Sequence, residues 1–284
     1  MKVLTKIIKF ILITVLTICL IASGILTIVS STILNQQYII QKLEETNFYH
    51  ETYELVKSNF ENYIYQSGLE EQVLENICTE EKVKSDLNTI ISNIYSGTDK
   101  KIDTTEISEN LNANIDKLGI KNSKNEKAIQ QFVKYICNEY TDTIMHTKYE
   151  DDINKQYVKI AELLAGIYNV VAIVIIVDVI LLIILNRKSL SKNLQDWSTA
   201  FLGIGLFSTI SSGIITSKVN IYGIKILNDT FSKALVSIIE EMMMKFISLG
   251  IGAILVAVVL MIIYAVIICK RKDENKREEQ TTDK

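Results

Sequence analysis

Four long runs of apolar residues dominate the pattern of hydrophobic and polar positions along this chain. They cover 10–34, 163–185, 197–217 and 246–269. Because an α-helix rises 1.5 Å per residue, each run is long enough to cross a hydrocarbon core about 30 Å thick. Asp178 is the only charged residue inside them. The pattern predicts an all-α integral membrane protein with four transmembrane helices.

The intervals between the runs have the periodicity of amphipathic helices. In 35–162, apolar residues recur at spacings of three and four, and cap or stop residues such as Thr79 and Gly97 separate the stripes. No alternating run is long enough for a strand, so we predict a helical bundle. The interval 218–245 also has one apolar face. We expect this face to pack on the bundle, because its polar face is not rich in Lys and Arg, as is typical of the alternative, a helix lying on the membrane surface.

Basic residues at the ends of the apolar runs predict the orientation of the chain. Lys and Arg gather in 1–9, 186–196 and 270–284, and short basic segments mark the cytoplasmic side. Both termini are therefore expected in the cytoplasm, and 35–162 and 218–245 outside the plasma membrane. The first run exceeds the h-region of about 7–15 residues of a cleaved signal peptide, so we expect it to remain as a span.

Composition narrows the class of partner. The chain contains no proline, which permits long uninterrupted helices. Acidic residues outnumber basic ones in 35–162, whereas nucleic-acid binding needs a positive surface. Abundant Lys, Asn and Ile with few Arg are typical of a bacterial protein from an AT-rich genome. The predicted partners are the lipid bilayer and another protein, or a second copy bound through the membrane helices, but no nucleic acid.

Small residues in the last two runs predict helix-packing faces. Helices in lipid associate where small side chains let their backbones approach closely. Such residues recur at helical spacing, and we expect them to contact other helices of this chain or of a second copy. The residues are Gly205, Thr209, Gly213, Ser208, Ser212, Ala253 and Ala257.

Asp178 is the most unusual residue of the spans. An acid near the bilayer centre costs about 2.5–3.5 kcal/mol on insertion scales, so it requires a reason. Thr14, Thr17 and Tyr264 lie at similar depth in the first and fourth runs and could donate hydrogen bonds to it. We favour a structural acid that holds helices together, because the spans contain no base. The alternative is an ion or proton site.

Two histidines suggest a possible metal site. Asp142, His146 and Glu150 recur every four residues, as do His50 and Glu54. If these two helix faces meet, they offer imidazole and carboxylate ligands for a divalent metal. Ordinary charge pairs on solvated helix faces explain the same spacing, and we favour that interpretation.

Two cysteines, Cys78 and Cys137, lie in the predicted outer domain, where a disulfide could persist. Both fall in apolar helical stretches. This context favours two buried thiols that fill the core, and the disulfide remains the alternative.

No catalytic motif is present in the sequence. It lacks the phosphate-binding loop G-x-x-x-x-G-K-[ST], the dinucleotide fingerprint G-x-G-x-x-G, the nucleophile elbow G-x-S-x-G and the metalloprotease pattern H-E-x-x-H. We therefore predict a protein that is not an enzyme and needs no cofactor.

The stretch 53–91, "YELVKSNFENYIYQSGLEEQVLENICTEEKVKSDLNTII", resembles the outer domain of uncharacterised four-span membrane proteins of low-GC Gram-positive bacteria. The resemblance implies the same architecture and brings no activity and no site residues.

Three functions are compatible with this layout. The first is a non-enzymatic membrane protein whose helical outer domain binds a partner or senses envelope conditions. The second is a permease-like component of an ABC-type system, because the order of one span, a large outer domain and three spans is similar to FtsX- and MacB-type permeases. The third is a small oligomeric channel lined by the serines and threonines of 197–217.

Overall fold

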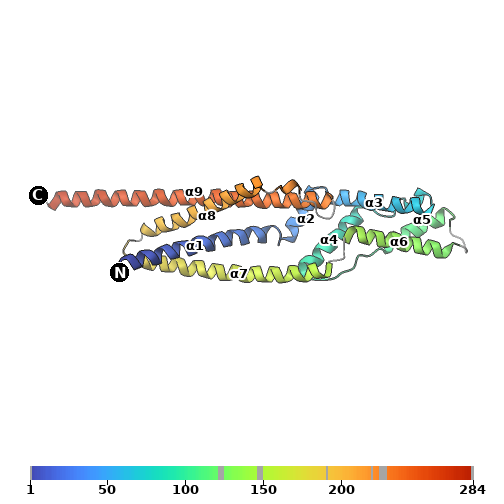
Figure 1. The fold of residues 1–284 in the computed structure, drawn as a ribbon, viewed down its shortest axis with the longest axis horizontal. Helices are drawn as coiled ribbons and strands as arrows, with labels where there is room; N and C mark the ends of the chain where they lie inside the picture. The colour runs from blue at the N-terminus through green and yellow to red at the C-terminus, as the bar shows by residue number, and fades with distance from the viewer. Residues whose placement is uncertain are drawn as a thin grey trace. The chain divides into compact units, whose positions relative to one another are not determined.

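The computed structural model describes residues 2–120, 125–145, 150–189, 191–218, 220–223 and 229–282. Every regular element in these ranges is a helix (Figure 1), which confirms the all-α prediction. Four helices are long and apolar enough to cross a membrane. They are α1 (Lys2–Ser31), α7 (Glu150–Leu185), α8 (Ser191–Lys218) and α9 (Asp229–Thr282).

The chain divides into two compact units. The span unit comprises Met1–Thr32, Leu163–Ile221 and Ile239–Lys284, and the helical unit comprises Ile33–Glu162 and Tyr222–Ile238. The remaining elements are α2 (Gln36–Glu45), α3 (Phe48–Ser67), η1 (Glu71–Leu74), α4 (Glu80–Ser96), α5 (Thr105–Lys117), α6 (Glu126–Met145) and η2 (Ile221–Gly223).

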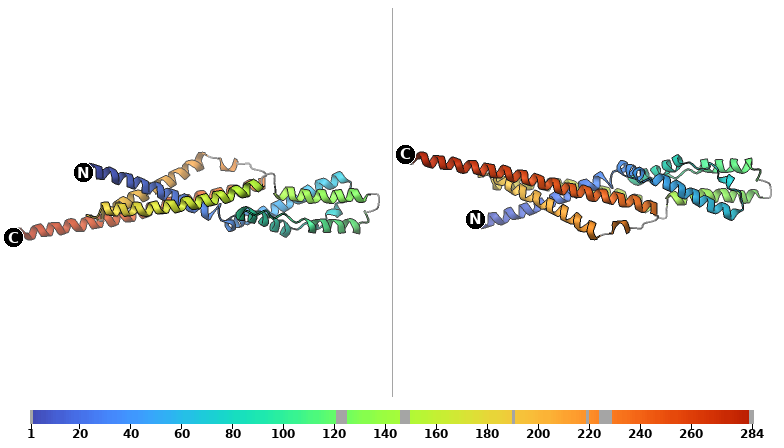
Figure 2. Two further views of the ribbon diagram at one scale, coloured as in Figure 1. Left: turned by 90° about the horizontal axis from the view of Figure 1, so that it is seen from below. Right: turned by 90° about the horizontal axis from the view of Figure 1, so that it is seen from above.

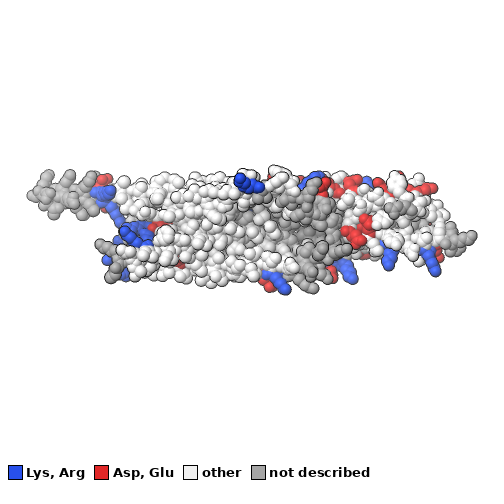
Figure 3. Space-filling view, in the orientation of Figure 1, with Lys and Arg blue, Asp and Glu red and all other residues white. Residues whose placement is uncertain are grey.

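In the span unit, α1 packs along α8, and both views of Figure 2 show the long helices of this unit extending alongside one another. Leu16, Leu182 and Ala200 form a small buried cluster between α1, α7 and α8. Large apolar side chains cover the surface, as at Ile176 and Leu255, which are 60% and 62% exposed. Figure 3 shows this surface as a broad band free of charged side chains. Such a surface is suited to hydrocarbon, which solvates apolar side chains as well as a protein core does.

The predicted close packing of small residues is found between α8 and α9. A Cβ atom built on Gly205 would lie 2.4 Å from a side-chain carbon of Ile254 and 2.9 Å from the carbonyl oxygen of Gly250. A Cβ atom built on Gly250 would lie 3.0 Å from a side-chain carbon of Ser208 and from one of Thr209. Ala253 and Ala257 are buried. Ser198 donates a hydrogen bond of 2.8 Å to the carbonyl of Ala257.

Gly213 does not take part in this packing. A Cβ atom at Gly213 would meet nothing within 4 Å, and the residue is exposed. Within this chain the fourfold spacing from Gly205 therefore does not predict a contact at Gly213, and its contact with a second copy stays a prediction. On α8 the contact face instead continues through Ser212, which is fully buried.

The helical unit is built around one core to which α2 to α6 and the beginning of α9 contribute. Val56, Phe60, Ile107, Leu111 and Ile136 are among its most completely buried side chains. They recur at helical spacing, so each amphipathic stripe of the sequence faces inward.

Local signals mark the beginning of α4 and the ends of α3 and α4. Thr79 Oγ1 accepts a hydrogen bond from the Lys82 amide (3.2 Å) and caps α4. Gly68 and Gly97 end α3 and α4 in the left-handed conformation, at φ 71° and 67°.

Tyr95 and Tyr157 fix the segment that follows α1. Their rings lie 4.6 Å apart. Tyr95 donates a hydrogen bond to the carbonyl of Ile33, and Tyr157 donates one of 3.4 Å to the carbonyl of Leu34. Asn35 then caps α2 by accepting from two backbone amides. These contacts end the first apolar helix at Ser31, three residues before the predicted end at position 34.

The interval 218–245 differs most from its prediction. It is not a separate helix, because α9 is unbroken from Asp229 through the last apolar run. The residues at positions 244–247 are Met, Lys, Phe and Ile, and none of them breaks a helix.

The expected packing of this interval on the bundle is found at the beginning of α9. Ala234 lies in the core of the helical unit, and Phe231 meets Phe48 edge to face at 6.4 Å. Lys233 forms an ion pair with Glu51 at 2.8 Å, and the lysine lowers the pKa of that carboxyl.

Two glycines of α8 give a matched test of the helix packing. Gly205→Val should lower the stability of the span unit by about 1–3 kcal/mol, because the new side chain collides with α9. Gly213→Val should have little effect, since its surroundings are open. Thermal denaturation of the detergent-solubilised full chain measures both, and equal losses would contradict the α8–α9 contact.

Candidate functional site

A buried polar cluster lies at the turn between α7 and α8. Asn186 Nδ2 donates hydrogen bonds of 2.7 Å to both Asn193 Oδ1 and Asp196 Oδ2. Lys9 Nζ on α1 lies 2.8 Å from Asp196 Oδ1. Asn186, Asn193 and Asp196 are all buried. This arrangement neutralises the acid and fastens α1, α7 and α8 together.

Sequence reasoning missed this cluster, because Lys9 and the 186–196 segment were interpreted only as signals of orientation. A usable signal was present. Asn193 and Asp196 share one helix face immediately before an apolar run, and an acid next to a span needs a partner.

Asp178 is buried on α7, with only 3% of its surface exposed. Its Oδ2 atom has no hydrogen-bond partner among the described residues. The predicted donors do not supply one. Thr14 and Thr17 donate instead to the carbonyls of Phe10 and Ile13, at 2.9 and 2.8 Å.

The prediction that Asp178 is held by these threonines is therefore wrong. A helical threonine can satisfy its hydroxyl on the carbonyl four residues earlier, within its own helix. Tyr264 lies partly exposed on α9, and none of the described hydrogen bonds joins it to Asp178.

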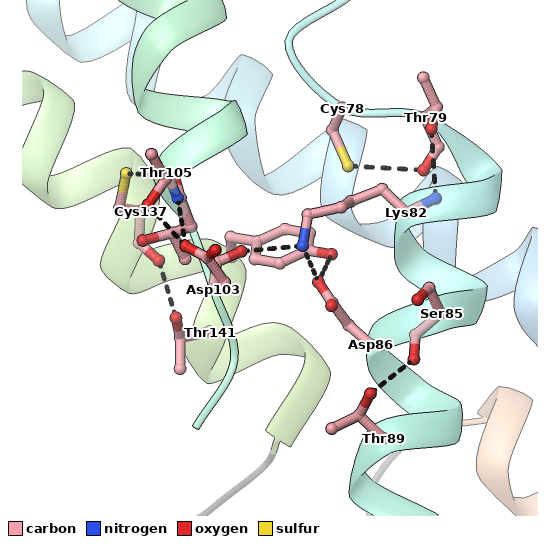
Figure 4. Close-up of polar contacts among 12 residues, drawn as sticks. Cys78, Thr79, Lys82, Ser85, Asp86, Thr89, Asp103, Thr105, Cys137 and Thr141 are labelled. Atoms are coloured by element: carbon pink, nitrogen blue, oxygen red, sulfur yellow. Dashed lines mark hydrogen bonds and ion pairs between the residues drawn. The ribbon is translucent and has the colours of Figure 1, made fainter. Parts of the chain in front are cut away.

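The helical unit has a polar centre of its own, drawn in Figure 4. Lys82 Nζ binds Asp86 Oδ2 at 2.7 Å and the carbonyl oxygen of Asp103 at 2.8 Å. Tyr140 donates a hydrogen bond of 2.6 Å to the same Asp86 oxygen. Burial and the hydrogen bond to Asp86 raise the pKa of Tyr140, so this phenol stays protonated. The network ties α4 and α6 to the loop before α5 and leaves no free nucleophile or base.

The two cysteines of this unit are free thiols with different partners (Figure 4). Cys78 Sγ lies 3.6 Å from the carbonyl of Thr79, and Cys137 Sγ lies 3.9 Å from the carbonyl of Thr104. Burial raises the pKa of Cys78 to about 12 and also raises the pKa of Cys137. A thiol with a raised pKa is a poor nucleophile.

The candidate metal ligands are only partly described. His50 Nδ1 lies 2.9 Å from Glu80 Oε2, which raises the pKa of the imidazole. Glu54 faces Lys57 at 3.4 Å, and Asp142 is exposed on α6. His146 and the side chain of Glu150 lie outside the described residues.

Within the described residues, no group of three His, Cys, Asp or Glu side chains is placed to bind a metal. Since two of the five candidate ligands are not described, the metal site stays a prediction.

An open polar depression of about 350 Å³ lies beside α4. Ser85, Thr89 and Lys100 line part of it. Asn93 also lines it, but this side chain already holds the loop after α4, by donating to the Lys100 carbonyl at 2.8 Å. The depression therefore lacks the convergent free polar groups of a built ligand site.

These features define an all-helical chain with the four long apolar helices of a multi-pass membrane protein and a separate helical unit. Comparison with family models, with curated proteins and with solved structures finds no match. The resemblance to four-span proteins of low-GC Gram-positive bacteria stays a prediction.

The Tyr140–Asp86 hydrogen bond can be tested with a matched pair of variants. Tyr140→Phe removes a buried bond to a carboxylate and should destabilise the helical unit by about 1.5–3 kcal/mol. Tyr135→Phe, on the same helix but 60% exposed, should change stability by less than about 0.5 kcal/mol. Urea unfolding of the full chain in detergent measures both, and a neutral Tyr140→Phe would contradict the network.

The state of Cys78 is tested by alkylation at pH 8. With a pKa of about 12, a fraction on the order of one in ten thousand is thiolate at this pH, so Cys78 in the folded chain should resist the reagent. After unfolding without reductant, mass spectrometry should show Cys78 and Cys137 both modified. Modification that requires a reductant would instead establish the disulfide.

Proposed function

We propose that this chain is a non-enzymatic, multi-pass protein of the plasma membrane whose helical unit lies outside the cell and binds a protein partner or senses envelope conditions. Basic segments flanking the spans support the orientation, with both termini in the cytoplasm. The helical unit has a complete core of its own, as a folded recognition domain requires.

The observation that carries the sensing part of the proposal is the continuity of α9. This one helix places Ala234 in the core of the helical unit and Ala253 and Ala257 in buried positions of the span unit. A packed helix without a break has no loop that absorbs a rotation or shift. Binding that repacks the core around Ala234 would therefore act on the helix that continues into the span unit.

A surface formed by α3 and α6 suits a partner protein. Tyr135 is 60% exposed, and the nearby carboxylate of Glu139 raises the pKa of the Tyr63 phenol. Asp142 is exposed one turn further along α6. Tyrosine is enriched in protein interfaces. Carboxylates beside it favour a partner segment rich in Lys or Arg through charge complementarity.

The permease-like alternative has less support. Docking of an ATPase needs an accessible cytoplasmic segment, and the candidate is the turn between α7 and α8. Asn186, Asn193 and Asp196 in this turn are buried and already bonded to one another or to Lys9. These three side chains are therefore not available to a docking ATPase.

Orientation is tested by cysteine labelling in intact cells. In a background without the native cysteines, Glu109→Cys on α5 should react with a membrane-impermeant maleimide. Asp273→Cys on α9 should react only after the cells are permeabilised. Both residues are exposed, so access alone decides the result. Labelling of both positions from the same side would reject the proposed layout.

Partner binding is tested by a photo-crosslinking residue at Tyr135 in the full chain, in native membranes. We expect a crosslinked product of defined mass that is lost in a Glu139→Lys/Asp142→Lys background, because the basic partner would be repelled. The control position is Tyr65, which is 74% exposed and lies about 200° around α3 from Tyr63, on the other side of that helix. No product from Tyr135, or the same products from both positions, would count against the proposed surface.

A further inference from the structure

Cations surround the buried polar contacts at the turn between α7 and α8. The segments 1–9 and 186–196 are rich in Lys and Arg, and Asp196 is the only acid in either of them. Its carboxylate already binds Lys9 at 2.8 Å. These two segments therefore contain no acid that could neutralise their other cations.

The exposed cations of these segments form what we call the basic corner: Lys6 on α1, Arg187 and Lys188 in the turn, and Lys192 on α8. No ion pair joins any of these side chains to another described residue. Figure 3 shows Lys and Arg side chains gathered at one end of the span unit, at the edge of the uncharged band.

Two contacts fix how α1 lies along α8. Lys9 meets Asp196 at one point. Further along both helices, a Cβ atom built on Gly203 would lie 2.7 Å from a side-chain carbon of Thr17. Because both contacts are reached by a nearly equal advance along each helix, α1 and α8 run parallel and in register.

This register holds the basic corner at one level of the span unit. Lys6 lies one turn before Lys9 on α1, and Lys192 lies one turn before Asp196 on α8. Each turn is about 5 Å long, so both lysines lie equally far beyond the ion pair. Asn186 donates a hydrogen bond of 2.7 Å to Asp196 and fixes the turn as well. Cations from three segments are thus preorganised around one ion pair.

The level of the basic corner is that of lipid headgroups. Lys9 is the last charged residue before the first apolar run, and Asp196 is the last before the third. The corner therefore lies just outside the hydrocarbon, where a phospholipid carries its phosphate. Basic sites between membrane helices are known to bind anionic headgroups at this level.

We propose that the basic corner binds the headgroup of an anionic phospholipid. In a zwitterionic headgroup an amine compensates the phosphate charge, whereas an anionic headgroup leaves that charge available to the protein. Cations held close together repel one another, and an anion between them relieves the repulsion. The proposal needs only that the apolar helices cross a bilayer, and it does not depend on the role of the helical unit.

Trp197 is the only tryptophan of the chain and lies beside this corner. It follows Asp196, is partly exposed, and packs against the buried cluster of Leu16, Leu182 and Ala200. Bromine on a lipid chain quenches tryptophan fluorescence only at close range. The fluorescence of Trp197 therefore reports which lipid occupies the adjacent surface.

The experiment uses the full chain reconstituted into vesicles of phosphatidylglycerol and phosphatidylcholine in equal amounts. In one sample the phosphatidylglycerol is brominated near the headgroup end of its acyl chains, and in the other the phosphatidylcholine is. The headgroup composition is the same in both, so a difference in quenching measures selection of lipid at Trp197.

We expect stronger quenching by brominated phosphatidylglycerol. One cation near an anionic surface contributes about a fivefold factor, so the preference at low salt should be about fivefold or more. Lys6→Gln/Lys192→Gln should lower the preference by a similar factor. High salt should also lower it, because salt screens exposed charges.

Lys270→Gln/Lys272→Gln is the matched control, because it removes the same charge from exposed residues of α9. Ser198 donates to the Ala257 carbonyl, and Lys270 lies about 20 Å further along α9 from that contact. This distance carries it past the level of Lys192, so the preference at the tryptophan should be unchanged.

Equal quenching in the two wild-type samples would overturn the proposal. Equal loss of the preference in both double variants would overturn it too, because that result is expected for a diffuse attraction of anionic lipid to every basic segment. The wild-type comparison requires no variant, so it decides the question even if a substituted chain does not fold.

Discussion

In hydrocarbon a polar group can form hydrogen bonds only with other groups of the protein or with a bound ligand. The rest of the span unit depends on this constraint. Backbone amides and carbonyls meet it by helix formation. The absence of proline keeps that pairing complete along the full length of α1, α7, α8 and α9. Threonine hydroxyls meet it by bonding to carbonyls of their own helix. The Asn186–Asp196–Lys9 cluster meets it with side chains from three helices.

The helical unit solves a different problem, because water can satisfy any polar group left at its surface. Its polar centre is therefore not forced by the solvent. A buried ion pair such as Lys82–Asp86 gains little net stability once desolvation is included, unless its remaining hydrogen-bond capacity is used. Here Tyr140 and the Asp103 carbonyl use that capacity. Both come from segments distant in sequence, so the pair selects one arrangement of α4, α6 and the intervening loop.

Features that depend on local chemistry could be predicted from the sequence. Apolar runs identify helices that can cross a membrane, Thr79 identifies the beginning of α4, and Gly68 and Gly97 identify the ends of α3 and α4. Each depends on the residue's own side chain and on neighbours within one turn. The continuity of α9 is local too. It was missed because the change from an amphipathic to a fully apolar pattern was interpreted as the end of one helix and the beginning of another. A helix can change its surroundings without ending.

Features that depend on the relative rotation of helices could not be predicted. Gly205 and Gly213 are equivalent in spacing, yet only Gly205 meets another backbone. Ser208 and Thr209 are neighbours in sequence, yet only the threonine bonds to its own helix, and the serine is fully buried without a hydrogen-bond partner among the described residues. Composition and periodicity cannot separate these pairs, because the difference arises from which side of α8 faces α9. The same limit applies to Asp178. Its depth in the span can be predicted from the sequence, but its hydrogen-bond partners cannot, because Thr14 and Thr17 donate to carbonyls of their own helix. A polar residue in a span is costly, and its position can be found in the sequence. Only the arrangement of the surrounding helices shows whether the protein itself supplies its hydrogen-bond partner.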